Sequence, residues 1–502
     1  MRILLKGWVC APDFSGLSRK AVLIENDRII AVETDISGTS AADKIFTFKK
    51  EIISPGFIDA HGHSDLSAPA APECFSKISQ GITSEICGNC GLSAFPVTPA
   101  NREHLEALYA NYGVPLDWAD FPGYMKRCTE YAPELRLFPL CGHNTLRAAV
   151  AGYEEKRISS KECDRMCRML ADQLDAGAVG LSSGLLYVPG CFAEADEILA
   201  LMGVLAIKNK PFTTHLRSEG DRLLESLEEI FELACRAGVH KVQISHLKTA
   251  GSDNFGKLDR AFALIGQYRS GGLDIRFDRY PYIESQTMLS VVLGKEYSGY
   301  GDGEISALFN DPEERCRAVD HLHSIRNEQY WKTRRLAGTG VSGYRKYQGM
   351  FFADIPGDPA ENVVDILYRS APDSMVASAN MSERNMLEII SHEQCVFGSD
   401  GNALPPDDRF GQPHPRSFGG APRFARLLLD RGIAIPEVCA RLSGNAAEFF
   451  GLPGVGSVTA GNFADLTVFD PDVIDSAADF RDPFRSPQGI TAVLCSGRIR
   501  CF

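Results

Sequence analysis

Two histidines separated by one glycine, His61-Gly62-His63, follow an apolar run at residues 52–58. Such a run predicts a short buried strand. On an extended strand, residues i and i+2 point to the same side, so both imidazoles can aim at one point. Neutral imidazole is a borderline-soft ligand that suits zinc. The pair therefore predicts half of a divalent-metal site, and a chance pair is the alternative unless further ligands are found.

Three further residues that could bind metal or move protons stand where predicted strands end. His215 closes the segment 212–215, His246 closes 242–246, and Asp400 closes 395–400. Taken alone, each histidine is more often a hydrogen-bonded residue of the core or rim. Barrel enzymes, however, keep their chemistry at the C-terminal ends of their strands. Together, the four imidazoles and the aspartate predict one metal-dependent centre.

A cysteine completes the candidate ligands at the end of another predicted strand. Cys90 lies in Gly88-Asn-Cys90-Gly91, and Cys87 precedes it by three positions. Cys87-x-x-Cys90 could be a redox pair, but the thioredoxin-like context of such pairs is missing. A thiolate ligand fits better, because a thiol is deprotonated on a metal and can lie between two metal positions. We expect Cys87 to be structural.

Apolar segments that alternate with helical patterns predict the framework for this centre. Before Gly177, a helical pattern brings Met166, Leu170 and Leu174 to one face at the 3.6-residue period. Eight strands alternating with helices are the count of a (β/α)8 TIM-like barrel, an α/β fold. The predicted strands are 53–63, 83–91, 135–144, 178–185, 212–217, 242–248, 273–282 and 395–401.

Both ends of the chain predict strands of one small domain. Residues 1–54 alternate apolar and polar positions, and 464–470 and 490–499 show the same pattern. We expect a small β-sandwich built from residues 1–54 and 456–502, with the catalytic barrel at 55–455 between them. More than a hundred residues separate Tyr282 from Cys395, so a long insertion is expected at about 284–390. It is either a lid over the site or a surface decoration.

Composition excludes several classes of protein. The 502 residues are 44% hydrophobic and 23% charged, as in an ordinary globular protein, and the net charge of −13 argues against a nucleic-acid partner. The apolar run before Lys6 is too short for a signal peptide, and no later stretch approaches a membrane span. We expect a cytoplasmic protein without a membrane partner, with reduced thiols at its 15 cysteines. An oligomer is compatible with the sequence.

A set of short motifs is distributed along nearly the whole chain. They are His61-Gly-His63, Gly88-Asn-Cys90-Gly91, His215-Leu-Arg-x-Glu219, Ser245-His246-x-Lys248, Tyr280-Pro-Tyr282, Gly398-Ser-Asp400-Gly401 and His414-Pro-Arg416. Together they resemble the D-aminoacylases, which are the N-acyl-D-amino-acid deacylases of the amidohydrolase superfamily. The Gly-Asn-Cys-Gly and His-Pro-Arg elements are the most selective.

The resemblance implies a zinc-dependent hydrolysis of N-acyl-D-amino acids to a carboxylate and a free D-amino acid. Asp400 would be the general base and then the acid that protonates the leaving amine. The tightly bound zinc would be held by Cys90, His215 and His246. A second, weaker position would use His61 and His63, with Cys90 as the bridge.

The small-molecule substrate needs a cation for its α-carboxylate, and Arg416 offers a planar fork suited to bidentate pairing. The resemblance adds Lys248 and Tyr282 as carboxylate-binding residues and Tyr187 as a pocket residue. Structural roles are the alternatives: Tyr282 could cap a strand, and Lys248 could be a solvated charge. In the motif His215-Leu-Arg-x-Glu219, Arg217 could form a structural ion pair with Glu219.

The chain departs from the family pattern at Glu284-Ser-Gln-Thr287, where relatives often carry a Gly-Ser-Thr element. An acid near the pocket could disfavour substrates with acidic side chains. The strand that contains Ser182 has no lysine to be carboxylated as a metal bridge, which argues against a hydantoinase. Another C–N hydrolase, acting on a cyclic amide or a dipeptide with a D residue, stays open, as does a barrel scaffold without catalysis.

Overall fold

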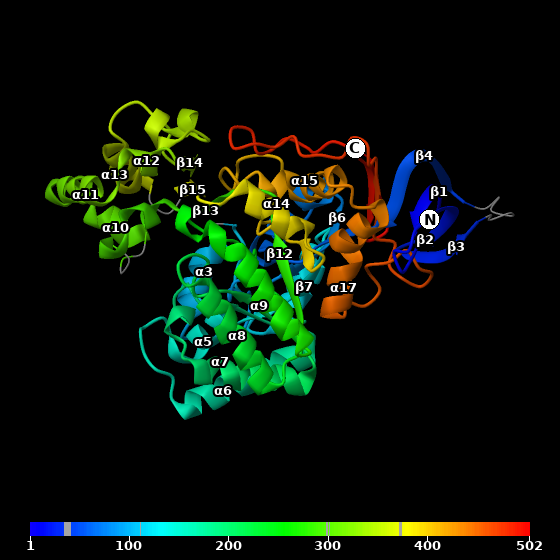
Figure 1. The fold of residues 1–502 in the computed structure, drawn as a ribbon, viewed down its shortest axis with the longest axis horizontal. Helices are drawn as coiled ribbons and strands as arrows, with labels where there is room; N and C mark the ends of the chain where they lie inside the picture. Colours follow the sequence, from blue (N-terminus) through cyan, green and yellow to red (C-terminus); the bar gives the residue numbers. More distant parts are fainter. Residues whose placement is uncertain (35–41, 111, 298–299, 301, 371–373, 502) are drawn as a thin grey trace.

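The computed structural model describes residues 1–502 apart from 35–41, 111, 298–299, 301, 371–373 and 502. Figure 1 shows a small sheet at the side of the N-terminus, a central region of strands and helices, and a lobe that projects from the opposite side. Helices and parallel strands alternate through the central region, so the chain has an α/β fold.

Strands from both ends of the chain form one seven-stranded sheet, in the order β19-β18-β17-β4-β1-β2-β3. Asn26 turns the hairpin between β2 and β3 with a positive φ of 56°, a conformation that Asn tolerates better than most residues. The strands are β1 (Arg2–Cys10), β2 (Leu17–Glu25), β3 (Arg28–Glu33), β4 (Lys44–Pro55), β17 (Leu466–Phe469), β18 (Ile490–Cys495) and β19 (Arg498–Cys501).

Two parallel sheets lie at the centre of the molecule, one in the order β5-β6-β7 and one in the order β16-β12-β11-β10-β9-β8. Leu140 alone separates β7 from β8, and a parallel bridge between Gly62 and Gly401 joins the ends of β5 and β16. The strands are β5 (Phe57–Asp59), β6 (Ile82–Cys87), β7 (Arg136–Pro139), β8 (Cys141–Gly142), β9 (Leu181–Gly184), β10 (Phe212–His215), β11 (Lys241–Ile244), β12 (Asp274–Arg279) and β16 (Cys395–Phe397).

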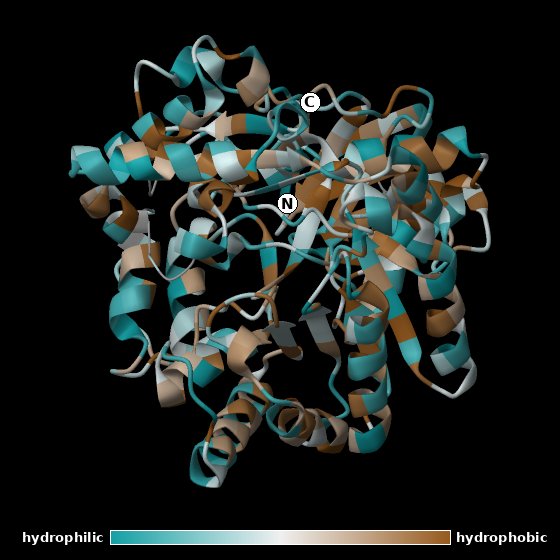
Figure 2. Ribbon diagram, turned by 60° about the vertical axis from the view of Figure 1, so that its left-hand side comes forward, coloured by the Kyte–Doolittle hydropathy of each residue, from teal (hydrophilic) through white to brown (hydrophobic). Residues whose placement is uncertain are grey.

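Amphipathic helices cover these strands. In α6 (Ser160–Ala176), Met166, Leu170 and Leu174 are buried, as the helical period predicts, and Ser159 with Glu162 forms a capping box at its start. Figure 2 shows the same separation of apolar and hydrophilic helix faces. The other helices of the central region are α1 (Ser64–Ser67), α2 (Phe75–Ile78), α3 (Arg102–Ala110), α4 (Phe121–Tyr131), α5 (His143–Ala151), α7 (Ala195–Lys208), α8 (Leu223–Ala237), α9 (Leu258–Ser270), α14 (Glu383–Ser391), α15 (Arg416–Asp430), α16 (Ile435–Cys439) and α17 (Asn445–Phe450).

Elements between Glu284 and Ala379 form the projecting lobe in Figure 1. Its antiparallel sheet has the order β13-β15-β14, and its buried residues, among them Leu293 and Phe352, form a hydrophobic cluster of their own. The elements are β13 (Glu284–Met288), α10 (Asp302–Leu308), α11 (Pro312–Ile325), α12 (Glu328–Trp331), β14 (Arg334–Gly338), α13 (Pro359–Ser370) and β15 (Met375–Ala379).

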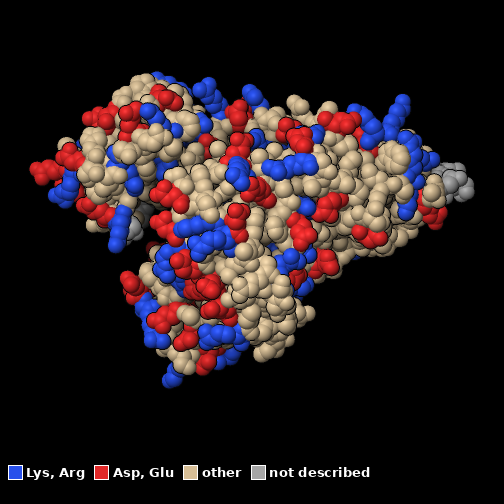
Figure 3. Space-filling view, viewed as in Figure 1, with Lys and Arg blue, Asp and Glu red and all other residues tan. Residues whose placement is uncertain are grey.

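The molecular surface agrees with an ordinary globular composition. Acidic and basic side chains are interspersed over the face shown in Figure 3. Within the described part of the chain, no helix combines the length and the apolar character needed to cross a bilayer.

Candidate metal centre

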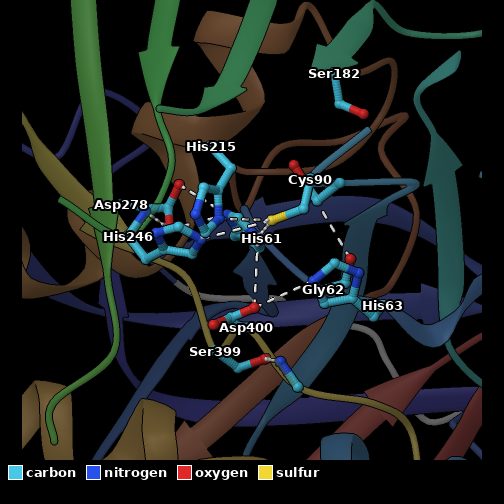
Figure 4. Close-up of polar contacts among 12 residues, drawn as sticks. His61, Gly62, His63, Cys90, Ser182, His215, His246, Asp278, Ser399 and Asp400 are labelled. Carbon is cyan, nitrogen blue, oxygen red and sulfur yellow. Dashed lines mark hydrogen bonds and ion pairs between the residues drawn. The ribbon is translucent and has the colours of Figure 1, made fainter. Parts of the chain in front are cut away.

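Six side chains that the sequence singled out meet at one edge of the parallel strands (Figure 4). Each comes from the C-terminal end of a strand, where side chains of neighbouring parallel strands converge. His61 and His63 follow β5, Cys90 follows β6, His215 ends β10, His246 follows β11, and Asp400 follows β16.

Cys90, His215 and His246 form a compact group, the cysteine–histidine set. Cys90 Sγ lies 3.8 Å from His215 Nδ1 and 3.5 Å from His246 Nε2, and the two nitrogens are 3.0 Å apart. Tetrahedral zinc, with bonds of about 2.0–2.1 Å to nitrogen and about 2.3 Å to sulfur, would separate its ligand atoms by about 3.4–3.6 Å. The spacing and chemistry of the three atoms therefore fit zinc.

His61, His63 and Asp400, together with the shared Cys90, form the histidine-pair set. His61 Nε2 lies 3.3 Å from Cys90 Sγ, and Asp400 Oδ1 lies 3.1 Å from His63 Nε2 and 3.7 Å from His61 Nε2. Cys90 belongs to both groups, so its thiolate has the placement needed to contact two metal positions.

The backbone turns sharply at three of these residues. Cys90, His246 and Asp400 have φ values of 52°, 35° and 51°, in the left-handed region that non-glycine residues seldom adopt. Such strain costs on the order of 1–3 kcal/mol per residue and persists only where the surroundings enforce it. Here it occurs at strand ends whose side chains must meet at one centre.

One buried and one partly buried carboxylate contact two of the candidate ligand imidazoles from behind. His61 Nδ1 lies 3.1 Å from Asp278 Oδ1, and His246 Nδ1 lies 2.8 Å from Glu219 Oε1. Donation of the His61 Nδ1–H to Asp278 leaves its Nε2 lone pair facing the centre, a common arrangement around metal-binding histidines. His246 Nδ1 lies beside both the Glu219 carboxylate and Lys248 Nζ, the latter at 2.9 Å. Sequence reasoning missed both carboxylates in this role, although Glu219 belongs to a motif that it quoted.

The expected alternative that pairs Arg217 with Glu219 is wrong. Arg217 Nε donates to Glu229 Oε1 at 2.9 Å, twelve residues further along the chain. Glu219 instead accepts from Lys248 Nζ at 2.6 Å. Lys248 is therefore a buried ion-pair partner and not a solvated charge.

The electrostatics of the centre favour anions at two positions. Burial raises the pKa of Cys90, but His61, His215 and His246 outweigh it, and the pKa is well below its usual value. The pKa of Asp400 is likewise well below its ordinary range, because Arg416 and the neighbouring imidazoles outweigh burial. A thiolate and a carboxylate surrounded by imidazole nitrogens form a strong cation site.

Two of the expected carboxylate-binding cations flank this centre. Arg416 Nη1 lies 2.9 Å from Asp400 Oδ2, and its guanidinium lies over the ring of Tyr280, 4.7 Å from the ring centroid. Lys248 Nζ is 6.0 Å from the same centroid. The buried Tyr280 hydroxyl has no hydrogen-bond partner among the described residues.

The structure does not bring the hydroxyl of Tyr282 to the metal ligands. It lies 3.3 Å from Ser476 Oγ and 3.5 Å from the carbonyl of Pro415. Tyr280, two positions earlier in the same motif, is the tyrosine whose ring lies near both Lys248 and Arg416. Sequence alone offered no signal to choose between the two tyrosines, because both follow the last residue of β12 within three positions.

Tyr187 lies at the exposed edge of the centre. Its ring is 4.7 Å from that of His215 in an edge-to-face arrangement, and the residue is 45% exposed. Asn144 fixes its loop by donating to the carbonyls of Gly184 (3.0 Å) and Tyr187 (3.2 Å). The structure thus brings Tyr187 beside a ligand of the cysteine–histidine set.

Glu284 differs from the free pocket acid that the sequence suggested. It is 6% exposed, and Arg335 of the lobe donates to its Oε1 at 2.9 Å. It borders a cavity of about 200 Å³ whose lining includes Tyr282 and Arg423 and none of the metal ligands described above. Because Arg335 neutralises it, Glu284 gives no reason to expect rejection of acidic substrates.

Cys87 is buried beneath the centre, and burial raises its pKa well above the usual value. It is absent from both donor sets. All fifteen cysteines of the chain are free thiols, so Cys87 forms no disulfide. Its burial and its place outside the donor sets agree with a structural role.

Comparison with known proteins identifies relatives over almost the full length. No model of a protein family matches the chain. An N-acyl-D-glutamate deacylase of Alcaligenes xylosoxydans xylosoxydans is 34% identical, and the match covers 98% of this chain and 91% of that protein.

Two solved structures share the architecture. An N-acyl-D-glutamate deacylase from Bordetella bronchiseptica, complexed with zinc and a phosphonate mimic of the tetrahedral intermediate, is 29% identical with a TM-score of 0.81. A D-aminoacylase, studied for one-metal activation and second-metal attenuation of its binuclear centre, is 29% identical with a TM-score of 0.79. Each match covers 99% of this chain and 96% of the other.

Proposed function

Because this chain belongs to the D-aminoacylase family of amidohydrolases, we propose that it hydrolyses the amide bond of N-acyl-D-amino acids. The products are a carboxylate and a free D-amino acid. The observation that carries the proposal is the convergence of Cys90, His215 and His246 with Asp400 at one strand edge. A thiolate and imidazoles beside a carboxylate suit metal-dependent hydrolysis better than any other chemistry of these side chains.

Zinc is the cofactor that this donor set favours. We assign the tight site to Cys90, His215 and His246, and a weaker second position to His61 and His63 with Cys90 shared. Zinc bound at such a site lowers the pKa of water to about 7 and polarises carbonyl oxygens. Asp278 and Glu219 orient the imidazoles of His61 and His246 for this task.

We assign Asp400 as the general base and then the general acid. Its low pKa keeps the carboxylate ionised at neutral pH, so Oδ1 can accept the proton of the attacking water. As the amide bond breaks, the same carboxyl returns the proton to the departing nitrogen. The neighbouring His63, 3.1 Å away, orients Oδ1 toward the centre.

We assign the α-carboxylate of the substrate to Arg416 and Lys248. The ring of Tyr280 lies near both cations, its buried hydroxyl has no partner among the described residues, and an anion would supply the acceptor that this hydroxyl lacks. We therefore give Tyr280 the role that the resemblance suggested for Tyr282. Tyr187, at the rim, is assigned to the pocket for the remainder of the substrate.

The domain division belongs to the same proposal. With β7 and β8 taken as one strand, the two parallel sheets supply eight strands, and the Gly62–Gly401 bridge supports closure into a (β/α)8 barrel at 55–455. The seven-stranded sheet supports a small sandwich at 1–54 and 456–502, because Leu5 and Leu466, from separate parts of the sheet, share one hydrophobic cluster. Residues 284–390 are the insertion. Free thiols throughout support a cytoplasmic location.

Two other functions compete with this proposal. A cyclic-amide hydrolase could use the same centre, although the strand with Ser182 offers no lysine to bridge metals. A scaffold without catalysis agrees less well with the backbone strain at Cys90, His246 and Asp400. Such strain costs stability and clusters at functional sites, and a scaffold has no need for it.

The test measures amine release by zinc-loaded protein from a panel of N-acetyl-D-amino acids and from a dipeptide with a D residue, and ring opening of a hydantoin to its N-carbamoyl amino acid. We expect the N-acetyl-D-amino acids to be the best substrates. Preferential opening of the hydantoin would contradict the proposal in favour of a cyclic amide. No hydrolysis of any compound at full zinc occupancy would favour the scaffold.

A further inference from the structure

A buried network of charges outside the donor sets lies beneath the strand ends of the centre. Lys77, on α2, is completely buried, and its Nζ lies 2.6 Å from Asp59 Oδ2 and 2.9 Å from Glu85 Oε2. Both carboxylates are also completely buried. A buried ammonium with two buried carboxylates is a costly arrangement that needs good geometry and further hydrogen bonds. No step of the proposed hydrolysis uses these three residues directly.

The ammonium of Lys77 reaches the residues on both sides of Asp400. It donates to Ser399 Oγ at 2.9 Å and to the carbonyl of Gly401 at 3.1 Å. Asp59 adds a second hold on this turn, since Oδ1 accepts from the backbone N–H of Ser399 at 2.8 Å. Asp400 itself has the left-handed φ of 51°. Lys77 and its partner Asp59 therefore help to hold the strained turn, together with the hydrogen bond from Gly401 N–H to Ser399 Oγ at 3.0 Å.

The same two carboxylates fix the turn of the histidine pair. Asp59 Oδ1 also accepts from the backbone N–H of His61 at 3.1 Å, and Glu85 accepts from both the N–H (2.8 Å) and the hydroxyl (2.6 Å) of Ser64. A Cβ atom on Gly62 would lie 2.1 Å from Glu85 Cδ. The histidine-pair turn thus packs directly on the network, which explains the glycine between the two histidines.

We propose that Lys77 is a positioning residue for the hydrolysis, holding Asp400 in register with the histidine pair through one buried ammonium. This inference rests on the proposed role of Asp400 as the base. Without the ammonium, Asp59 and the Gly62–Gly401 bridge still join the two turns, but the contacts with Ser399 and Gly401 on both sides of Asp400 are lost, and the carboxylate of Asp400 moves relative to His63. A misplacement of about 1 Å costs on the order of 100-fold in rate.

Loss of Lys77 should affect the side of the centre that carries Asp400 and the histidine pair. Lys77 contacts the Asp400 turn directly, whereas its contact with the strand before Cys90 is made through Glu85, five residues before the cysteine. The tight zinc should therefore survive the loss of Lys77. This separation distinguishes positioning from a general contribution to folding.

The test compares Lys77→Met with the double variant Lys77→Met/Glu85→Gln, using Glu85→Gln alone as the matched control. Lys77→Met leaves two buried carboxylates without a cation and could fail to fold. The double variant removes one carboxylate together with the ammonium, so the formal charge of the network stays at its original value. Thermal melting, zinc content, kcat and KM are measured for each protein.

We expect the double variant to fold, to retain one tight zinc per chain, and to show kcat about 100-fold below Glu85→Gln with KM changed less than about threefold. Recovery of kcat to the Glu85→Gln value would overturn the proposal, because Lys77 would then only balance charge. Loss of the tight zinc together with kcat would also overturn it, since Lys77 would then support the whole centre.

A wild-type protein without hydrolytic activity would refute the proposed function and not the positioning by Lys77. In that case equilibrium dialysis of zinc tests the positioning role of Lys77 without a measurement of activity. The double variant must then lose affinity for the weaker zinc at the histidine pair and keep the tight one. Unchanged affinity at both positions would refute the positioning role.

Discussion

Arg416 Nη1 lies 2.9 Å from Asp400 Oδ2, so the cation assigned to the substrate's carboxylate also contacts the assigned general base. The guanidinium is held over Tyr280, and both ends of the contact are largely buried. When a substrate carboxylate shares this guanidinium, part of the charge that stabilises ionised Asp400 is diverted. Substrate binding should then raise the pKa of Asp400 toward neutrality, where a base works best.

Replacing Arg416 by Ala should shift the pH dependence of the reaction. Burial raises the pKa of Asp400, and Arg416 is the largest of the charges that lower it. Without Arg416 the pKa rises, and since the base must be ionised, activity is lost at a higher pH as the solution is acidified. Loss of the charged hydrogen bonds to the substrate should also reduce kcat/KM by about 10- to 100-fold. An acidic limb of kcat/KM at the wild-type pH would contradict the contact as described.

Replacing Asp400 by Asn should lower kcat by about 10²- to 10⁴-fold, the usual contribution of a general acid–base group. The amide keeps the shape of the side chain but cannot accept the proton of water. Because we assign the tight zinc to Cys90, His215 and His246, the zinc content should stay near that of the wild type. Metal analysis and steady-state kinetics on one preparation check both points, and wild-type turnover would remove Asp400 from its assigned role.

Cys90 and Cys87 form a matched pair of thiols, three residues apart. Cys90→Ala should lose the tight zinc and the activity together, because one of three ligand atoms disappears. Cys87→Ala removes a thiol that lies outside both donor sets, so zinc content should be retained. Equal loss of zinc from the two variants would show that the thiol of Cys90 has no special part in metal binding.

Tyr280 and Tyr282 provide a second matched pair. Tyr280→Phe removes the unpartnered hydroxyl of the ring that lies near Lys248 and Arg416, and KM for a substrate with a free carboxylate should rise about tenfold. Tyr282→Phe removes a hydroxyl near Ser476 and Pro415, so KM should change little. The reverse order of effects would restore Tyr282 to the role that the resemblance suggested.

The strand ends of the centre could be predicted because local rules govern them. A hydrophobic run followed by His61 or His246 fixes both the strand and its end, and parallel strands bring such ends together. The stripes on α6 follow from periodicity alone in the same way. The roles given to the ligands also needed the resemblance to a family, since spacing cannot say which residue binds more tightly.

The partners behind the ligands could not be predicted, because they depend on contacts between distant segments. Glu284 pairs with Arg335, which lies 51 residues later in the chain on another strand of the lobe sheet, and no local pattern predicts that ion pair. Glu219 has Arg217 beside it in sequence yet contacts Lys248. Lys77 belongs to no motif, and only the packing of α2 against two strand ends reveals its contacts.

The most direct test of the account is the rate of amine release from N-acetyl-D-glutamate and N-acetyl-L-glutamate by protein stripped of metal and then reconstituted with one equivalent of zinc. The account predicts release from the D enantiomer, dependent on the added zinc, and little from the L enantiomer. Equal release from both enantiomers, or an undiminished rate in the metal-free protein, would contradict it.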